Sequence, residues 1–197
     1  MEKEVLKLID YLYGQDKPPH EPKYKRQREI IEHARSLYGD YGGRLHTELL
    51  HRLNGYAIEN LTDWNYDSCF RFDVLLHPGV PYKIRDEASA IELVQKLCGT
   101  AYFLALEISA LGPYYRYFFY QEIYDTSNQT LIEKLSESPF SIDHAEILKK
   151  VVQYCEDKGF IRLDEELLDP VVPGIALELA EEGEVTIYNC LFADTYH

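Results

Sequence analysis

The sequence lacks any apolar segment long enough to cross a membrane. Its longest uninterrupted apolar run, Ala101–Leu106, is ended by Glu107, whereas a spanning helix needs about 18 or more consecutive apolar residues. The first residues, Met1–Glu4, do not have the basic and then apolar layout of a secretory signal. These absences predict a soluble, cytoplasmic protein that does not associate with membranes.

Cysteine is scarce, and its spacing forms no motif. The four cysteines, at positions 69, 98, 155 and 190, stand far apart in apolar stretches. There is no Cys-x-x-Cys pair, and no histidine stands beside a cysteine at metal-ligand spacing. We therefore expect four reduced, buried thiols that act as small apolar side chains, without a disulfide and without a metal site.

Common catalytic signatures are also missing. The sequence has no Gly-x-Ser-x-Gly, no Walker-type phosphate loop, no Gly-x-Gly-x-x-Gly and no His-Glu-x-x-His. The nearest histidine pair, His46 and His51, would point about 140° apart on a helix. Asp73 and His77, at the end of an expected strand, could form an acid–base pair together with a third group. The pattern favours a binding protein over an enzyme, with no cofactor.

Basic side chains are few relative to acidic ones. The 197 residues include 20 Lys and Arg against 34 Asp and Glu, a formal net charge of −14. Residues 1–60 are neutral in sum, so the whole excess lies in residues 61–197. A field of this sign repels nucleic acid and anionic membranes and favours a basic partner. The alternative explanation of the acidic excess is that it only keeps the protein soluble.

The chain opens with a helical segment, residues 1–58. Apolar side chains at helical spacing predict amphipathic helices around Val5–Leu12, Gln27–Tyr38 and Leu45–Leu53. A stiff connector with two prolines, residues 16–20, separates the first two helices. Short helices of this kind enclose only a thin core, so we expect the segment to pack against the rest of the chain.

The body of the protein, residues 64–197, shows the alternation that is typical of strands. Apolar and polar residues alternate along Cys69–Leu76, and longer apolar stretches predict strands at Ala101–Leu111 and Tyr115–Ile123. Gly112–Pro113 between the last two strands predicts a tight hairpin turn.

Helices are expected between and after these strands. Asp86 and Asp143 are suitable residues to cap two of them. The remaining pattern predicts a short helix at 131–135, an edge strand at 160–163 and a final strand at 185–192.

The order of these elements predicts the fold class. Residues 1–197 are expected to form one α+β domain, in which the helical segment 1–58 precedes the sheet-containing body 64–197. Hairpins interspersed with helices favour a mainly antiparallel sheet with helices on one face.

A carboxylate stands in the middle of the most apolar expected strand. Glu107 must be paired or exposed, because burying a lone charge costs several kcal/mol. A turn at Gly112–Pro113 would place Glu107 opposite Phe118 and diagonal to Arg116, and we expect an ion pair with Arg116 or Arg71. The alternative is a binding site on the open face of the sheet, formed by Arg71, Asp73, Glu107, Arg116 and Tyr120.

Tyrosine is abundant, with 17 copies against a single tryptophan. The run Tyr114–Tyr120 concentrates aromatic rings on one expected strand. Exposed tyrosines often mark interfaces, whereas cross-strand aromatic pairs stabilise a core, and the sequence leaves both interpretations open.

Charge and composition together predict a function class. We expect an acidic protein that docks a basic protein partner, in the manner of an inhibitor or of an immunity protein against a toxin. The alternative is a small-molecule-binding protein or enzyme whose site surrounds Glu107 and Arg116. The sequence leaves homo-oligomerisation open.

Overall fold

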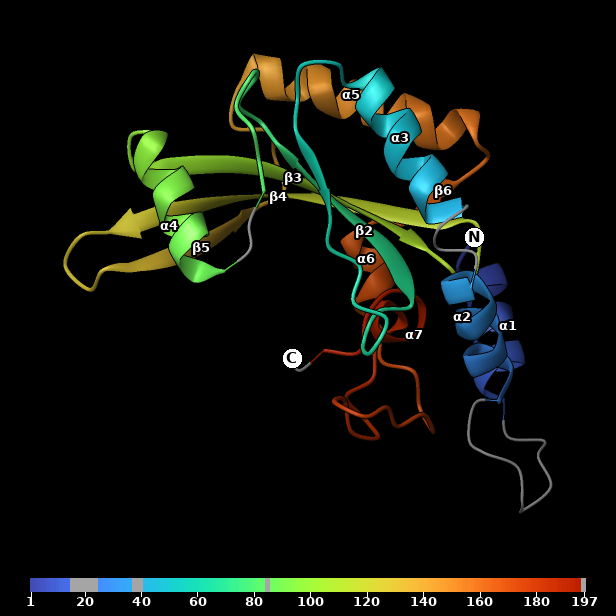
Figure 1. The fold of residues 1–197 in the computed structure, drawn as a ribbon. Helices are drawn as coiled ribbons and strands as arrows, with labels where there is room; N and C mark the ends of the chain where they lie inside the picture. The colour runs from blue at the N-terminus through green and yellow to red at the C-terminus, as the bar shows by residue number, and fades with distance from the viewer. Residues whose placement is uncertain (15–24, 37–40, 84–85, 196–197) are drawn as a thin grey trace.

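The computed structural model describes residues 1–14, 25–36, 41–83 and 86–195, so the expected connector at 16–20 lies outside it. The described residues form helices and strands that combine into an α+β fold, with the helical segment before a mainly antiparallel sheet, and this prediction is confirmed (Figure 1). None of the described helices has both the length and the apolar character of a membrane span. In chain order the elements are α1 (Glu2–Tyr13), α2 (Lys25–Ser36), α3 (Gly43–Arg52), β1 (Ile58–Asn60), β2 (Cys69–Leu75), α4 (Glu87–Lys96), β3 (Thr100–Ser109), β4 (Tyr114–Asp125), β5 (Thr130–Ser136), α5 (Ile142–Asp157), β6 (Ile161–Arg162), α6 (Glu165–Leu168) and α7 (Ile187–Leu191).

The sheet is built around β3. Its strands lie in the order β1-β2-β3-β4-β5 with antiparallel pairing throughout, and β6 adds a short parallel pairing to the start of β4. Odd-numbered and even-numbered residues of β3 are both buried, so both faces of this strand are covered. This explains why its sequence is almost continuously apolar. The strands predicted at 69–76, 101–111 and 115–123 are confirmed, with ends that differ by a few residues.

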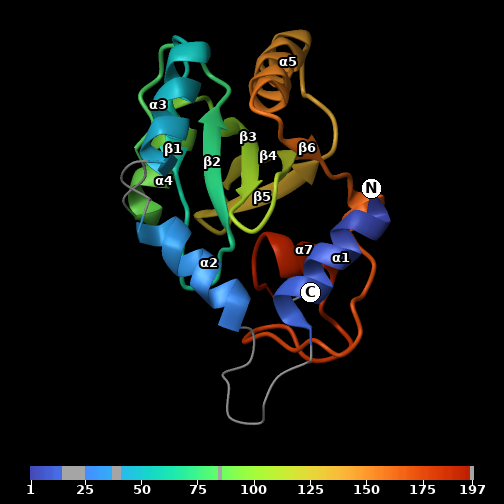
Figure 2. The same cartoon turned by 90° about the vertical axis from the view of Figure 1, so that its right-hand side faces the viewer.

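α3 and α5 cover one face of the sheet. Both lie on the same side of the strands in Figures 1 and 2. Phe72, Leu106 and Phe119 project from β2, β3 and β4 on this side, are fully buried, and share a hydrophobic cluster with Leu49 of α3 and Val151 of α5. The main core therefore lies between the sheet and this pair of helices.

α4 and α7 lie at the two ends of the opposite face. Leu93 and Val94 of α4 pack in a cluster with Phe103, while at the other end the Ser109 hydroxyl donates to the carbonyl of Leu191, at 2.7 Å. We expected helices on one face; the structure contains that layer and adds these two helices. They are needed because the second face of β3 is also apolar and must be removed from water.

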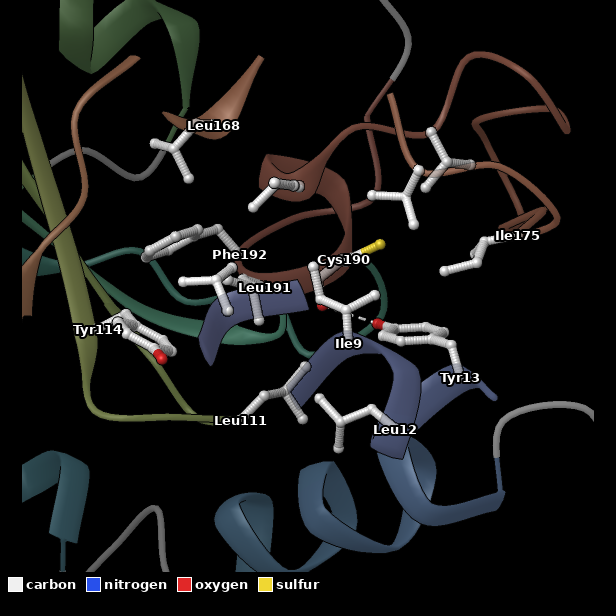
Figure 3. Packing of buried hydrophobic residues seen from close by; sticks show 14 of the residues in the cluster. Ile9, Leu12, Tyr13, Leu111, Tyr114, Leu168, Ile175, Cys190, Leu191 and Phe192 are labelled. Carbon is white, nitrogen blue, oxygen red and sulfur yellow. Dashed lines mark hydrogen bonds between the residues drawn. The ribbon is translucent and has the colours of Figure 1, made fainter. Parts of the chain in front are cut away.

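The N-terminal helix packs on the C-terminal part of the chain, as Figure 3 shows. Ile9 and Leu12 of α1 lie in one buried cluster with Leu191 and Phe192. The Tyr13 hydroxyl donates to the carbonyl of Cys190 at 2.8 Å. The expectation that the helical segment packs against the remainder is thus confirmed for α1.

The prediction of a short helix at 131–135 is wrong, because these residues belong to β5. After a turn at 126–129 the chain returns antiparallel to β4, and Leu131 and Leu135 lie opposite Tyr124 and Tyr120. Pairing to a long neighbouring strand outweighs the weak local helical preference of the segment.

The prediction of a final strand at 185–192 is also wrong, because the segment contains the short helix α7. Thr186 and Asn189 form a capping box at its start, in which each side chain bonds the backbone N–H of the other residue. Ile187, Cys190 and Leu191 are buried. A short helix that is apolar on most sides cannot be distinguished from a buried strand by periodicity.

The starts of α4 and α5 differ in how well they were predicted. Asp86 caps α4 as expected, since its carboxylate accepts the Ser89 N–H at 2.8 Å. α5 begins earlier than expected, because Ser141 caps it by accepting the His144 N–H at 3.2 Å. Asp143 therefore lies in the first turn of α5, where its charge favours the helix dipole.

All four cysteines are free thiols, but only three are buried. Cys98 is exposed, so the prediction of burial was wrong for this residue. It follows α4 in a backbone turn with φ 60°, outside the apolar stripe of that helix. Burial raises the pKa of the Cys190 thiol to about 12, so this thiol stays protonated and poorly nucleophilic at neutral pH.

The packing of α1 makes a direct prediction. Ile9→Ala should lower the free energy of unfolding by about 2–5 kcal/mol, because it leaves a cavity in a closed cluster. Leu6→Ala on the same helix, at a side chain 40% exposed, should lower it by less than about 1 kcal/mol. Urea denaturation of both variants checks this, and equal losses would contradict the packing of α1 on α7.

Candidate functional site

Three charged residues form one row across the centre of the sheet. Arg71 of β2 lies opposite Glu107 of β3, which lies opposite Arg116 of β4. The hairpin turn spans residues 110–113 rather than the predicted Gly112–Pro113, because β3 ends at Ser109 and β4 begins at Tyr114. The predicted register, with Glu107 opposite Phe118, was therefore wrong by two residues.

Glu107 is paired with Arg116, as one of the two expected partners. The Arg116 Nε lies 3.1 Å from Oε2 of Glu107, but Oε2 has no aligned hydrogen bond within the described chain. The contact is therefore mainly electrostatic. Burial raises the pKa of the Glu107 carboxyl, and the positive charges of Arg116 and Arg71 oppose that rise.

Asp73 lies two residues after Arg71 on β2, on the same face of the sheet, and is completely buried. The Arg71 Nε donates to its Oδ1 at 3.3 Å, and the Tyr120 hydroxyl donates to its Oδ2. Burial and the negative charge of Asp73 both raise the pKa of Tyr120, so this phenol remains a neutral donor. Burial and the negative charge of Asp73 also raise the pKa of Tyr82, which precedes α4.

The structure thus brings together all five residues that the sequence singled out. We call Arg71, Asp73, Glu107, Arg116 and Tyr120 the charged cluster. Its two guanidinium and two carboxylate groups balance, and Asp73, Glu107 and Tyr120 are 0%, 2% and 4% exposed. The face of the sheet is therefore not open at these three residues, and a binding role for the charged cluster stays a prediction.

Arg116 connects the charged cluster to the protein surface. Its guanidinium carbon lies 4.8 Å from the ring centre of Phe118 and 4.6 Å from that of Tyr188. Two aromatic rings at this distance hold the cation by cation–π attraction. The guanidinium group is therefore held in place by Glu107 and by the two rings.

A notch interrupts the outer edge of β4. β6 pairs with β4 as far as Tyr115, and β5 pairs with it from Phe119 onward, so Tyr117 pairs with neither strand. A surface hollow of about 720 Å³ lies at this point. We call it the β4 notch, lined by Arg116, Tyr117, Phe118, Leu135, Ser136, Glu137, Ser138, Arg162, Asp164, Glu165 and Glu166.

The rim of the β4 notch is acidic. Glu137, Asp164, Glu165 and Glu166 are exposed, and none forms an ion pair within the described part of the chain. Arg162 is the cation of the rim, and it lies 4.3 Å from the ring centre of Tyr117. Asp164 caps α6 by accepting the Leu167 N–H at 3.2 Å, whereas the carboxylates of Glu137, Glu165 and Glu166 are available to positive groups of a partner.

The β4 notch was not among the sites predicted from the sequence, although the sequence contains one signal of its acidic rim. After Arg162 the chain has no further Lys or Arg, but it has nine Asp and Glu residues. That asymmetry marks the C-terminal segment as the source of the acidic excess. The gap between β5 and β6 could not be foreseen, because the sequence does not show where each strand stops pairing.

The aromatic run of β4 is mostly core. Tyr114, Tyr115, Phe119 and Tyr120 are buried, whereas Tyr117 and Phe118 are half-buried and line the β4 notch. The two interpretations of the run therefore apply to different residues of the same strand.

The weaker sequence candidates do not come together. Asp73 belongs to the charged cluster and bonds to Arg71 and Tyr120. The ring of His77 instead accepts the Tyr102 N–H at 3.2 Å and stacks on Tyr102, so the two side chains form no acid–base pair. Among the described residues no three His, Cys, Asp or Glu side chains converge as a metal would require.

A second pair of carboxylates lies on the same face, nearer to α4. Glu122 of β4 stands directly opposite Glu133 of β5, and Oε2 of Glu122 is buried without a hydrogen-bond partner in the described chain. Burial, Glu133 and Asp73 raise the pKa of Glu122. Like charges directly opposite each other destabilise a sheet.

Comparison with known proteins identifies no relative: no family model, no curated protein and no solved structure matches the chain. The function must therefore be argued from the site itself.

The charged cluster predicts a large effect of one substitution. Asp73→Asn should lower the free energy of unfolding by about 3–5 kcal/mol, because Arg71 then keeps a half-buried charge without its partner. Asp157→Asn, which breaks an exposed pair with Arg52, should leave stability nearly unchanged. Chemical denaturation compares the two, and a small effect of Asp73→Asn would show that the charged cluster does not stabilise the fold.

The Glu122–Glu133 pair predicts a pH dependence. A carboxyl whose folded-state pKa is raised destabilises the fold at neutral pH, and this penalty disappears as the pH falls below the unfolded value near 4.5. Glu122→Gln should therefore raise the denaturation midpoint at pH 7, and its advantage should vanish by about pH 4. A variant less stable than the native chain at pH 7 would contradict the repulsion.

Proposed function

We propose that the protein binds a basic protein partner through the β4 notch, as an inhibitor or an immunity protein binds its target. The observation that carries the proposal is the acidic rim, formed by Glu137, Asp164, Glu165 and Glu166 around an interrupted strand edge. Exposed carboxylates without cations of their own complement Lys and Arg side chains of a partner and accelerate association.

The β4 notch also offers anchoring surface inside the acidic rim. Tyr117 and Phe118 are half-buried, and Leu135 is 69% exposed. Aromatic groups inside a polar rim are typical of binding hot spots, and the exposed Leu135 adds apolar contact area beside them. Tyr117 has no backbone partner on this side within the described residues, so its N–H and C=O add one donor and one acceptor for a partner's main chain.

A small-molecule site at the charged cluster is the second candidate. Its support is Oε2 of Glu107, which is buried and lacks an aligned hydrogen bond. Glu107 is only 2% exposed, so a ligand would first have to displace Arg116 from between Phe118 and Tyr188. We therefore favour the protein partner. A cytoplasmic location belongs to the same proposal, because four free cysteines suit a reducing compartment.

Capture from a native lysate tests the proposed function. The immobilised chain should retain a basic protein at low salt and release it as salt rises, because screening weakens charge attraction. Replacing Glu137, Glu165 and Glu166 together by Gln should abolish the retention. Mass spectrometry of the eluates identifies what is bound.

The matched control removes the same charge elsewhere. Glu29, Glu146 and Glu156 are exposed on α2 and α5 and lie outside the β4 notch, so their triple replacement by Gln should leave retention intact. Equal loss in both variants would mean that net charge alone causes binding. Retention of acidic proteins, or of nothing, would refute the proposal.

A further inference from the structure

The outer edge of β5 is unpaired along the described chain. β5 bonds to β4 on one side, and no other described strand lies on its far side. An exposed strand edge presents backbone donors and acceptors that a strand of another chain can use. β5 ends at Ser136, where the β4 notch begins, so the two features form one continuous margin of the sheet.

The register shows which backbone groups point outward. The Tyr124 N–H donates to Gly99, so even-numbered residues of β4 bond to β3 and odd-numbered ones face β5. Since Gln121 lies opposite Lys134, even-numbered residues of β5 bond back to β4. The N–H and C=O groups of Leu131, Glu133 and Leu135 therefore point away from the sheet, without a backbone partner in the described chain.

The side chains of the same three residues define what would pair with them. Leu135 is 69% exposed and Glu133 is exposed. Glu133 stands next to Glu122, whose buried Oε2 lacks a donor within the described residues. A cation placed beside Glu133 would relieve the repulsion between the two carboxylates.

We infer that β5 accepts an extended segment of the basic partner as an additional strand, with a Lys or Arg beside Glu133 and apolar residues beside Leu131 and Leu135. The inference rests on the proposed function, because that function supplies a basic partner. It adds the mode of recognition, in which main-chain hydrogen bonds give affinity and alternate side chains give specificity.

A second copy of the chain fits this edge less well. The antiparallel register that overlaps the outward-facing residues most fully would pair Leu131 with Leu135 and would place Glu133 opposite Glu133 of the other copy. Two Glu122–Glu133 pairs would then meet without a cation. Charge complementarity therefore selects a basic strand over self-association.

A synthetic peptide provides the probe. The isotope-labelled full chain is titrated with acetyl-Thr-Val-Thr-Arg-Thr-Val-Thr-amide, and amide shifts and hydrogen exchange are followed by NMR. The amides of Leu131, Glu133 and Leu135 should shift and gain protection, whereas those of Ile132 and Lys134 are already bonded to β4 and should change little. The same peptide with Glu in place of Arg should bind at least about fivefold more weakly.

A pair of variants isolates the backbone contribution. Leu135→Pro removes one outward N–H and spares the ladder to β4, since Lys134 and Ser136 supply those bonds. Leu135→Ala removes the same side chain but keeps the N–H. The peptide should bind the proline variant about fivefold more weakly than the alanine variant, as expected for one lost hydrogen bond. Glu133→Gln, which leaves the backbone unchanged, should weaken binding of the Arg peptide.

The outcomes separate this inference from the proposed function. Peptide shifts confined to other surfaces, or equal binding by the proline and alanine variants, overturn strand addition at β5. A concentration-dependent dimer in sedimentation that Leu135→Pro abolishes overturns it in favour of a second copy. Capture of a basic protein that depends on Glu137, Glu165 and Glu166 but not on β5 leaves the proposed function standing without strand addition. Capture that depends on β5 but not on Glu137, Glu165 and Glu166 supports strand addition and shows that the β4 notch is not part of the binding site.

Discussion

The carboxylate of Glu107, buried at the centre of β3, sets how the three central strands pair. A slip of one residue would turn it into the apolar cluster around Leu106 and Phe119, and a slip of two would separate it from Arg116. An unpaired charge at this depth costs several kcal/mol. The observed register is therefore favoured over registers shifted by one or two residues, by electrostatic energy as well as by packing.

That register also determines where the sheet margin is incomplete. β4 is longer than either strand on its outer side, so β6 covers its beginning, β5 covers its second half, and Tyr117 is left between them. Strand edges are ordinarily covered or blunted because they invite pairing with other chains. Here the gap and the free side of β5 lie next to each other and are bordered by acidic side chains.

Interior and surface charges follow different rules in this protein. Inside, each carboxylate of the charged cluster has a guanidinium beside it, and Tyr120 adds a neutral donor. Around the β4 notch, four carboxylates have no ion pair within the described chain. The interior arrangement satisfies the requirement of burial, whereas the surface arrangement leaves binding capacity for a cationic partner.

Periodicity and composition by themselves determined the α+β class, the strands β2 to β4, the helix after Asp86, and Glu107 as a residue that needs a partner. These features depend on local alternation and on the high free energy of a lone buried charge, both readable along the chain. Only the tertiary structure decided that 131–135 is a strand, that 185–192 is a helix, that Arg116 stands opposite Glu107, and that β4 keeps an open notch. Those features depend on the partners each segment meets across the sheet, and pairing energies between distant residues exceed the small local preferences that a sequence displays.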